Sequence, residues 1–209
     1  LLEGISSLLD QKNIVKPISI SQATISLLKL ESVIKILIKK HSSGELEYAF
    51  EGLISNLSEA PLLFKLMSIC PLPDLELELI FKDIRSILLF SIDEIKDFNR
   101  VLLFQSALAL QCFTNEYIYS ENSEESSAVQ ALESQVEEML LRGRQPNPEL
   151  ILCLASYRPL YKYEWRDLLV STDRIEEVVN RQIVEPNYES QLKSNMEVLQ
   201  KITNVVSSK

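Results

Sequence analysis

The longest helical pattern in the sequence covers residues 92–119, and it constrains the fold more than any other stretch. Ser91 and Glu94 have the spacing of a capping box, which predicts where this helix begins. A helix of this length reaches across a small domain, so we expect shorter helices to pack on it. Its apolar residues recur every three or four positions and therefore share one face: Ile95, Phe98, Val101, Leu102, Leu108, Ala109, Cys112 and Phe113.

Similar spacing recurs through most of the chain, with capping signals between the segments. Asp74 is expected to cap a helix that ends near Phe90, and Asn147-Pro148-Glu149 has the residue order of a helix start. Residues 120–127 are predicted to be an acidic loop, either solvated or able to attract a cation through Glu121, Glu124 and Glu125. No run alternates apolar and polar residues for the length of a strand. The sequence therefore predicts an all-α fold, an irregular bundle of about ten helices.

The predicted helices fall into two regions. Residues 1–57 are expected to form N-terminal helical hairpins, and a repeat-like hairpin over residues 20–57 would suit the end of a helical-repeat region. Residues 58–209 are expected to form a helical bundle. Leu1 already lies inside an apolar pattern, so we expect the chain to be part of a longer protein.

The chain carries a formal net charge of -9. A nucleic-acid-binding surface needs a basic footprint, so this charge argues against a nucleic-acid partner, and it disfavours an anionic membrane as well. The most apolar early stretch, residues 25–38, contains Lys29, Glu31 and Lys35, which argues against a membrane span. We expect a soluble protein that a basic partner could approach.

Residue types that assemble catalytic sites are scarce. Cys70, Cys112 and Cys153 stand far apart among apolar residues, which predicts reduced thiols in the core of a cytoplasmic protein. His41 is the only histidine, too few for a hydrolase triad or a histidine-based zinc site. The 4 glycines are isolated and follow no predicted strand, so we expect no cofactor pocket. The sequence predicts no catalytic, cofactor-binding or metal-binding residue.

Aromatic and cationic residues are concentrated in residues 157–166, which contain the only tryptophan. Such side chains anchor many protein interfaces and can also stack on a nucleobase. Alternatively, the aromatic rings pack on the bundle while an arginine satisfies helix-end carbonyls, and a buried hydrogen-bond network joins this segment to residues 115–117. We predict an interaction surface formed by Asn115, Glu116, Tyr117, Tyr157, Arg158, Tyr161, Trp165 and Arg166.

Four motifs follow one another over about residues 60–190. They are Pro61-Leu62-Leu63 with Pro73-Asp74-Leu75-Glu76-Leu77-Glu78, then Gln111-Cys112-Phe113-Thr114-Asn115-Glu116-Tyr117, then Ala155-Ser156-Tyr157-Arg158-Pro159-Leu160, and last Gln182-Ile183-Val184-Glu185-Pro186. Their order and spacing resemble the helical region that precedes the catalytic domain in bacterial S-adenosylmethionine-dependent methyltransferases with tetratricopeptide-like N-terminal regions.

The resemblance implies that a methyltransferase domain follows Lys209, with S-adenosylmethionine as the cofactor of that domain and none in this chain. No catalytic or cofactor-binding residue carries over, because the catalytic domain is not part of this sequence. We expect a non-catalytic helical region that recognises a substrate or partner protein or supports the catalytic domain, with residues 111–117 and 157–166 facing that domain. The alternatives are a stand-alone helical adaptor for a protein or peptide and, with least support, an enzyme complete within these residues.

Overall fold

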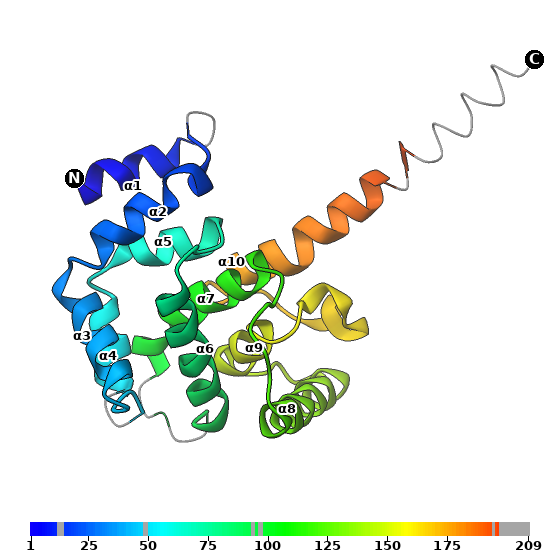
Figure 1. Ribbon diagram of the computed structural model, residues 1–209. Coiled ribbons are helices and arrows are strands. Elements are labelled where there is room, and N and C mark those ends of the chain that lie inside the picture. The colour runs from blue at the N-terminus through cyan, green and yellow to red at the C-terminus, as the bar shows by residue number, and fades with distance from the viewer. Residues whose placement is uncertain (12–14, 48–49, 93–94, 96–97, 194, 197–209) are drawn as a thin grey trace, which may run out of the picture.

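The computed structural model describes residues 1–11, 15–47, 50–92, 95, 98–193 and 195–196. Within these ranges the chain forms ten α-helices and no β-strand, which confirms the predicted all-α bundle (Figure 1). Two short 3₁₀ helices and one π-helix complete the regular structure.

The elements follow one another with short connections. The α-helices are α1 (Leu2–Asp10), α2 (Pro17–Leu28), α3 (Ser32–Ser42), α4 (Phe50–Leu57), α5 (Pro61–Ile69), α6 (Leu75–Phe90), α7 (Phe98–Thr114), α8 (Ser123–Leu141), α9 (Pro148–Ala155) and α10 (Glu176–Val179). The 3₁₀ helices are η1 (Leu160–Lys162) and η2 (Glu164–Leu168), and the π-helix is η3 (Asn180–Val184). Helical residues continue from η3 through 185–193.

Several helices begin where the sequence predicts. The Asp74 carboxylate accepts a hydrogen bond from the Leu77 N–H at 3.0 Å, so Asp74 caps α6 as expected. Pro61 and Pro148 are the first residues of α5 and α9, where the missing N–H of proline costs nothing because no helical partner exists for it. Local sequence therefore decides where these three helices begin.

Helix α8 begins inside the stretch 120–127 that is predicted to be a loop. The Asn122 side chain accepts a hydrogen bond from the Glu125 N–H at 2.8 Å, and the Glu125 carboxylate accepts one from the Asn122 N–H at 3.0 Å. The two residues form a capping box with Asn in the place of Ser or Thr. The loop prediction is wrong from Ser123 onwards, because these polar side chains satisfy the free N–H groups of a helix start.

The predicted capping box of Ser91 and Glu94 lies in part outside the described residues, since these do not include Glu94. Ser91 itself caps the C-terminus of α6, where its N–H donates to the Ile87 carbonyl at 2.9 Å. The helix that follows is therefore described only from Phe98 onwards.

The C-terminal end of α7 is a tight left-handed turn. Glu116 and Tyr117 have φ angles of 59° and 58°, and the Tyr117 N–H donates to the Cys112 carbonyl at 2.8 Å. A left-handed turn of this kind satisfies a free carbonyl at a helix end. It stops α7 at Thr114, so the predicted extension of this helix to residue 119 is wrong.

Buried apolar side chains gather into two clusters, and α7 contributes to both. Phe104 and Leu108 belong to the first cluster, which also takes residues from helices α1–α6, while Ala109 and Leu110 belong to the second, with residues of α8–α10. This confirms that shorter helices pack on α7. The division at residue 57 stays a prediction, and helices on both sides of it share the first cluster. No helix among the described residues is long and apolar enough to cross a membrane.

The position of α7 between two clusters can be tested with two leucines on it. We expect Leu108→Ala to lower the free energy of unfolding by about 2–5 kcal/mol, because Leu108 is fully buried and its truncation leaves a cavity. The control, Leu103→Ala, should change it by less than ~0.5 kcal/mol, because Leu103 is 65% exposed. Urea unfolding followed by circular dichroism measures both, and equal losses would contradict this placement.

Candidate functional site

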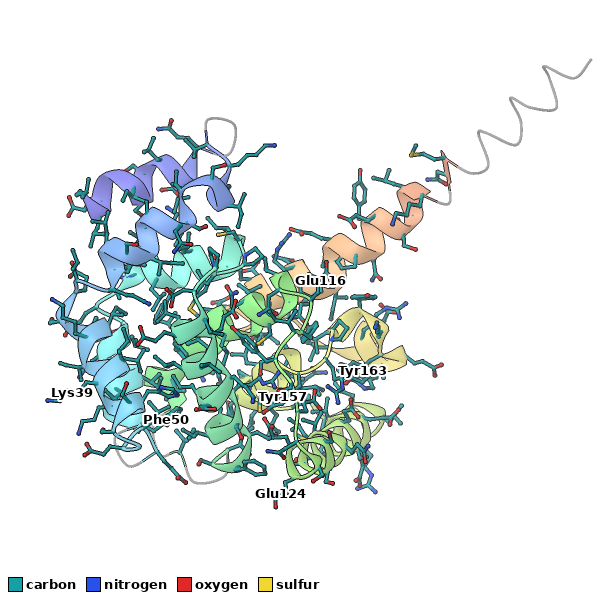
Figure 2. The ribbon with its side chains drawn as sticks, in the orientation of Figure 1. Lys39, Phe50, Glu116, Glu124, Tyr157 and Tyr163 are labelled. Carbon is teal, nitrogen blue, oxygen red and sulfur yellow. The ribbon has the colours of Figure 1, made fainter. Side chains whose placement is uncertain are left out.

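The residues of the predicted interaction surface lie close together, but they are less exposed than expected. Tyr157, Trp165 and Asn115 are only 1%, 4% and 7% exposed, so the expectation of an exposed interaction surface is wrong for these three residues. Figure 2 labels Tyr157 and Tyr163 in the lower part of the molecule, with Glu116 above them. Glu116 is exposed, and the partly exposed members are Tyr117, Arg158, Tyr161 and Arg166.

Arg85 of α6 is the largest fully buried side chain and lies among these residues. Its Nη2 donates to the carbonyl oxygens of Tyr119 and Ser120 at 3.3 and 3.2 Å. The guanidinium carbon lies 4.1 Å from the centre of the Tyr157 ring and 5.6 Å from that of Tyr119, within cation–π range. Arg85 therefore holds the connection between α7 and α8 against α6.

Glu125 supplies the negative charge opposite Arg85. One of its carboxylate oxygens lies 3.9 Å from the Arg85 Nη2, and both side chains are almost fully buried. The same oxygen accepts a hydrogen bond from the Tyr157 hydroxyl at 2.9 Å. Burial raises the pKa of Tyr157, so the hydroxyl keeps its proton and acts as a donor. A buried cation and a buried carboxylate are thus paired, as buried charges must be.

A second ionic group surrounds Arg158. Its Nη2 donates to Glu121 at 2.9 Å, its Nη1 donates to the other oxygen of the same carboxylate, and its Nε lies 3.6 Å from Glu133. Glu133 also accepts a hydrogen bond from the Tyr163 hydroxyl at 2.6 Å, and the Tyr163 ring stacks on Trp165 at a centroid distance of 4.5 Å. Glu121 and Glu125 of the predicted acidic loop therefore pair with arginines of this chain, so for these two the expectation that they are solvated or attract a cation is wrong. Glu124 is exposed, as expected for a solvated residue.

Gln182 in η3 makes four hydrogen bonds with its buried carboxamide. Its Nε2 donates to the carbonyls of Ala109 and Ala155, both at 3.1 Å. Its Oε1 accepts from the Tyr117 hydroxyl and from the Leu160 N–H, both at 3.2 Å. The carboxamide has two donors and two acceptor positions, so all of them are occupied. One side chain therefore joins α7, α9 and the start of η1.

Gln111 plays the same part between α7 and α5. In the carboxamide orientation that satisfies both of its polar atoms, Nε2 donates to the carbonyls of Met67 and Cys70 at 3.0 and 3.2 Å. Its Oε1 then accepts from the Leu72 N–H at 3.1 Å. Gln111 is 1% exposed, so these backbone groups at the end of α5 have no access to water and depend on it.

The arginines of the segment 157–166 also meet carbonyls. Arg158 donates to the Tyr157 carbonyl at 2.9 Å, and Arg166 donates to those of Tyr161 and Tyr163 at 3.2 and 3.3 Å. These contacts match the alternative reading of the segment, in which rings pack on the bundle and arginines satisfy the backbone. The buried network between this segment and residues 115–117 is present too, because the Tyr117 hydroxyl and the Leu160 N–H both donate to the Gln182 Oε1.

The three cysteines are free and buried, as predicted for thiols of the core. Burial raises the pKa of Cys70 to about 11 and that of Cys112 and Cys153 to about 12. Thiols with such pKa values stay protonated near neutral pH and are poor nucleophiles. The cysteines therefore act as packing residues.

Three central residues were missed at the sequence level, namely Arg85, Glu125 and Gln182. Each is four positions from a buried apolar residue of its own helix, respectively Phe81, Val129 and Val178. A polar residue that falls in register with an apolar face is the signal that was available. Periodicity alone does not say which polar groups lie opposite, so their partners could not be read from it.

Two shallow hollows lie side by side along α7. They share Leu103, Ser106 and Glu177 as lining residues and have volumes of about 260 and 310 Å³. Their walls mix apolar side chains with Lys65 of α5 in one hollow and with Arg174 in the other. In the described part of the chain, no group of three or more His, Cys, Asp or Glu side chains is placed to hold a metal ion.

The role of Gln182 as a cross-link leads to a stability test. We expect Gln182→Ala to lower the free energy of unfolding by about 3 kcal/mol, because several buried backbone groups lose their partners. Gln191→Ala is the matched control, since Gln191 follows in the same helical run and is exposed. Denaturant unfolding followed by Trp165 fluorescence compares them, and an equal effect of the two variants would rule out the cross-link.

The ion pair of Glu121 predicts a pH dependence. Its hydrogen bond to Arg158 holds the pKa of Glu121 below the ordinary value of 4.5. A carboxyl group whose pKa is lower in the folded state contributes stability that is complete above its unfolded pKa. This stability is lost as the pH falls through the folded pKa. We expect Glu121→Gln to reduce the fall in thermal midpoint between about pH 5 and about pH 3.

A double-mutant cycle isolates this pair. In an Arg158→Met background, Glu121→Gln should leave the pH profile of the thermal midpoint nearly unchanged, because the partner that lowers the pKa is gone. The same effect of Glu121→Gln in both backgrounds would show that Arg158 is not the cause.

Comparisons with protein-family models, with curated proteins and with solved structures found no match to this chain. The function proposed below therefore rests on the contacts within the chain and on the resemblance of its motifs.

Proposed function

We propose that this chain is a non-catalytic helical region of an S-adenosylmethionine-dependent methyltransferase that supports the catalytic domain and serves in recognition of a substrate or partner protein. The single observation that carries the proposal is that three of the four motifs meet. They are far apart in the sequence, yet buried hydrogen bonds join their residues.

Three of the motifs meet at Gln182. It belongs to the last motif, it accepts from Tyr117 of the second, and it binds Ala155 and Leu160 of the third. The motif residues that Gln182 joins therefore belong to one buried network, which supports the interpretation of these motifs as parts of one structural unit.

The second motif also reaches the stretch between the two halves of the first. Gln111 binds the backbone of Met67, Cys70 and Leu72, which lie between Pro61-Leu62-Leu63 and the half that begins at Pro73. Asp74 in that motif caps α6, the helix that carries Arg85. The motif residues thus serve the architecture of the bundle, which supports the reading of this chain as a structural region.

The chemistry of these residues also favours a supporting role. Tyr117, Tyr157 and Tyr163 have pKa values raised by burial, and each donates its proton to a carboxamide or carboxylate of this chain. Hydrogen bonds of this kind hold the elements of the bundle together, which fits a supporting role. The proposal places the methyl transfer in the neighbouring domain.

The glycines of this chain do not fit a role in holding S-adenosylmethionine. Gly44 and Gly143 follow the ends of α3 and α8 with φ angles of 69° and 73°, and Gly4 and Gly52 lie inside α1 and α4. A nucleoside pocket of the doubly wound type takes its glycines from a turn between a strand and a helix. The cofactor belongs to the catalytic domain of the intact protein, for which a cytoplasmic location is part of the proposal because the thiols are free.

Binding of S-adenosylmethionine tests the proposal. We expect the intact protein, read from the natural coding sequence, to bind the cofactor with a stoichiometry near one and to transfer its methyl group, while residues 1–209 alone bind none. Isothermal titration calorimetry measures the binding of S-adenosylmethionine to the intact protein and to residues 1–209. A coding sequence without a methyltransferase domain, or an intact protein that binds no S-adenosylmethionine, would overturn the proposal in favour of a stand-alone helical adaptor.

A further inference from the structure

Residues 176–193 form one helical run that begins in the core and leaves the body of the molecule, and residues 195–196 are helical as well. Val178, Val179 and Ile183 are buried in the second apolar cluster. From Val184 onwards the side chains are exposed or only partly buried, and Figure 1 shows this orange helix running outwards beyond α10. Residue 194 lies outside the described part of this run.

The outer part of this helix carries a stripe of exposed apolar side chains. Val184, Tyr188, Leu192 and Met196 are 52%, 61%, 44% and 60% exposed. Their spacing of four places them along one side of the helix. Most of the residues between them are polar or charged. Single exposed apolar residues are common, but a row of four on one helix side marks a contact surface.

The helix that carries the stripe is anchored in the bundle by its buried first residues. Gln182 makes its four buried hydrogen bonds immediately before the stripe begins, and Ile183 packs in the core. The ion pair between Arg181 and Glu185 then links the buried part of the helix to the exposed part. The helix thus presents its apolar side in a defined direction relative to the bundle, which reduces the entropy lost when a partner docks.

We infer that Val184, Tyr188, Leu192 and Met196 are the docking face for the methyltransferase domain of the intact protein. This inference rests on the proposed function and names the contact through which the helical region would support its catalytic domain. It replaces part of the surface predicted from the sequence, because Tyr157 and Trp165 are buried and already have partners.

The size of the stripe favours a tethered partner over a free one. A stable interface between separate proteins takes roughly 20 to 30 residues a side, far more than this stripe offers. A domain joined by the same chain has an effective concentration on the order of 1 mM, so a small apolar contact is enough to hold it. Contacts between domains of one chain are of this modest kind.

Charge argues against a second copy of this chain as the occupant. Each copy carries a net charge of -9, so two copies repel each other at long range. Parallel pairing of two stripes would also bring Glu185 and Glu189 of one helix towards the same residues of the other. A catalytic domain in the same chain meets any charge repulsion once, when the protein folds, and not with each association.

Hydrogen exchange of the intact protein tests the inference. We expect the amides of residues 184–196 to exchange about tenfold more slowly in the intact protein than in residues 1–209 alone, because docking covers them. The double variant Tyr188→Ser/Leu192→Ser should lose this protection and lower the methyl-transfer rate with unchanged affinity for S-adenosylmethionine. The matched control is Leu75→Ser/Leu141→Ser, two leucines exposed by 72% and 69% on α6 and α8, which should change neither.

The possible results separate the two proposals. An intact protein that binds S-adenosylmethionine but exchanges these amides as fast as the isolated region would overturn the docking face and leave the proposed function standing. An intact protein that binds no S-adenosylmethionine overturns the proposed function, and the docking face with it. A dimer of residues 1–209 in sedimentation experiments, abolished by the double variant, would assign the stripe to a second copy and also overturn the inference.

Discussion

The burial of the Arg85 charge is the constraint on which the centre of this protein depends. A guanidinium group without access to water needs its charge to be balanced inside the protein. The Nε and Nη1 of Arg85 have no hydrogen-bond partner among the described residues, so its burial depends on the charge of Glu125, on the two bonds of Nη2 and on the rings around it. Glu125 supplies the charge, two carbonyls accept hydrogen bonds, and the Tyr157 and Tyr119 rings cover the cation. These partners come from α8, from the turn after α9 and from the connection after α7, so these elements have to meet at α6.

The geometry of that connection follows from the same requirement. The left-handed residues Glu116 and Tyr117 turn the chain away from α7, and the next residues aim their carbonyls at Arg85. The capping box of Asn122 and Glu125 then starts α8 at the point where the Glu125 carboxylate reaches both Arg85 and Tyr157. One carboxylate thus caps a helix and balances a buried charge. Strain at the turn is offset by contacts that no other conformation provides.

Two glutamines extend this principle to the whole bundle. Apolar contacts hold the two clusters on either side of α7, but apolar surfaces alone tolerate many registers. Gln111 and Gln182 bind particular carbonyls and N–H groups on neighbouring elements, which allows one arrangement only. In the proposed function, this network fixes the direction in which the helix after Gln182 leaves the bundle, so that its exposed apolar side can position another domain.

The sequence by itself determined the helices and their faces. The spacing of apolar residues indicated an all-α chain, Asp74, Pro61 and Pro148 marked helix starts, and isolated cysteines indicated buried thiols. Tertiary structure alone decided which polar residues meet. Arg85 and Glu125 are 40 positions apart along the chain, and Tyr157 is a further 32 from Glu125. Periodicity tells which side of a helix is buried, because it follows from local backbone geometry. It does not tell which side chains lie opposite, because that depends on how distant helices pack. The sequence therefore left open whether Tyr157 and Trp165 form a surface or pack on the bundle, and the tertiary structure decided for packing.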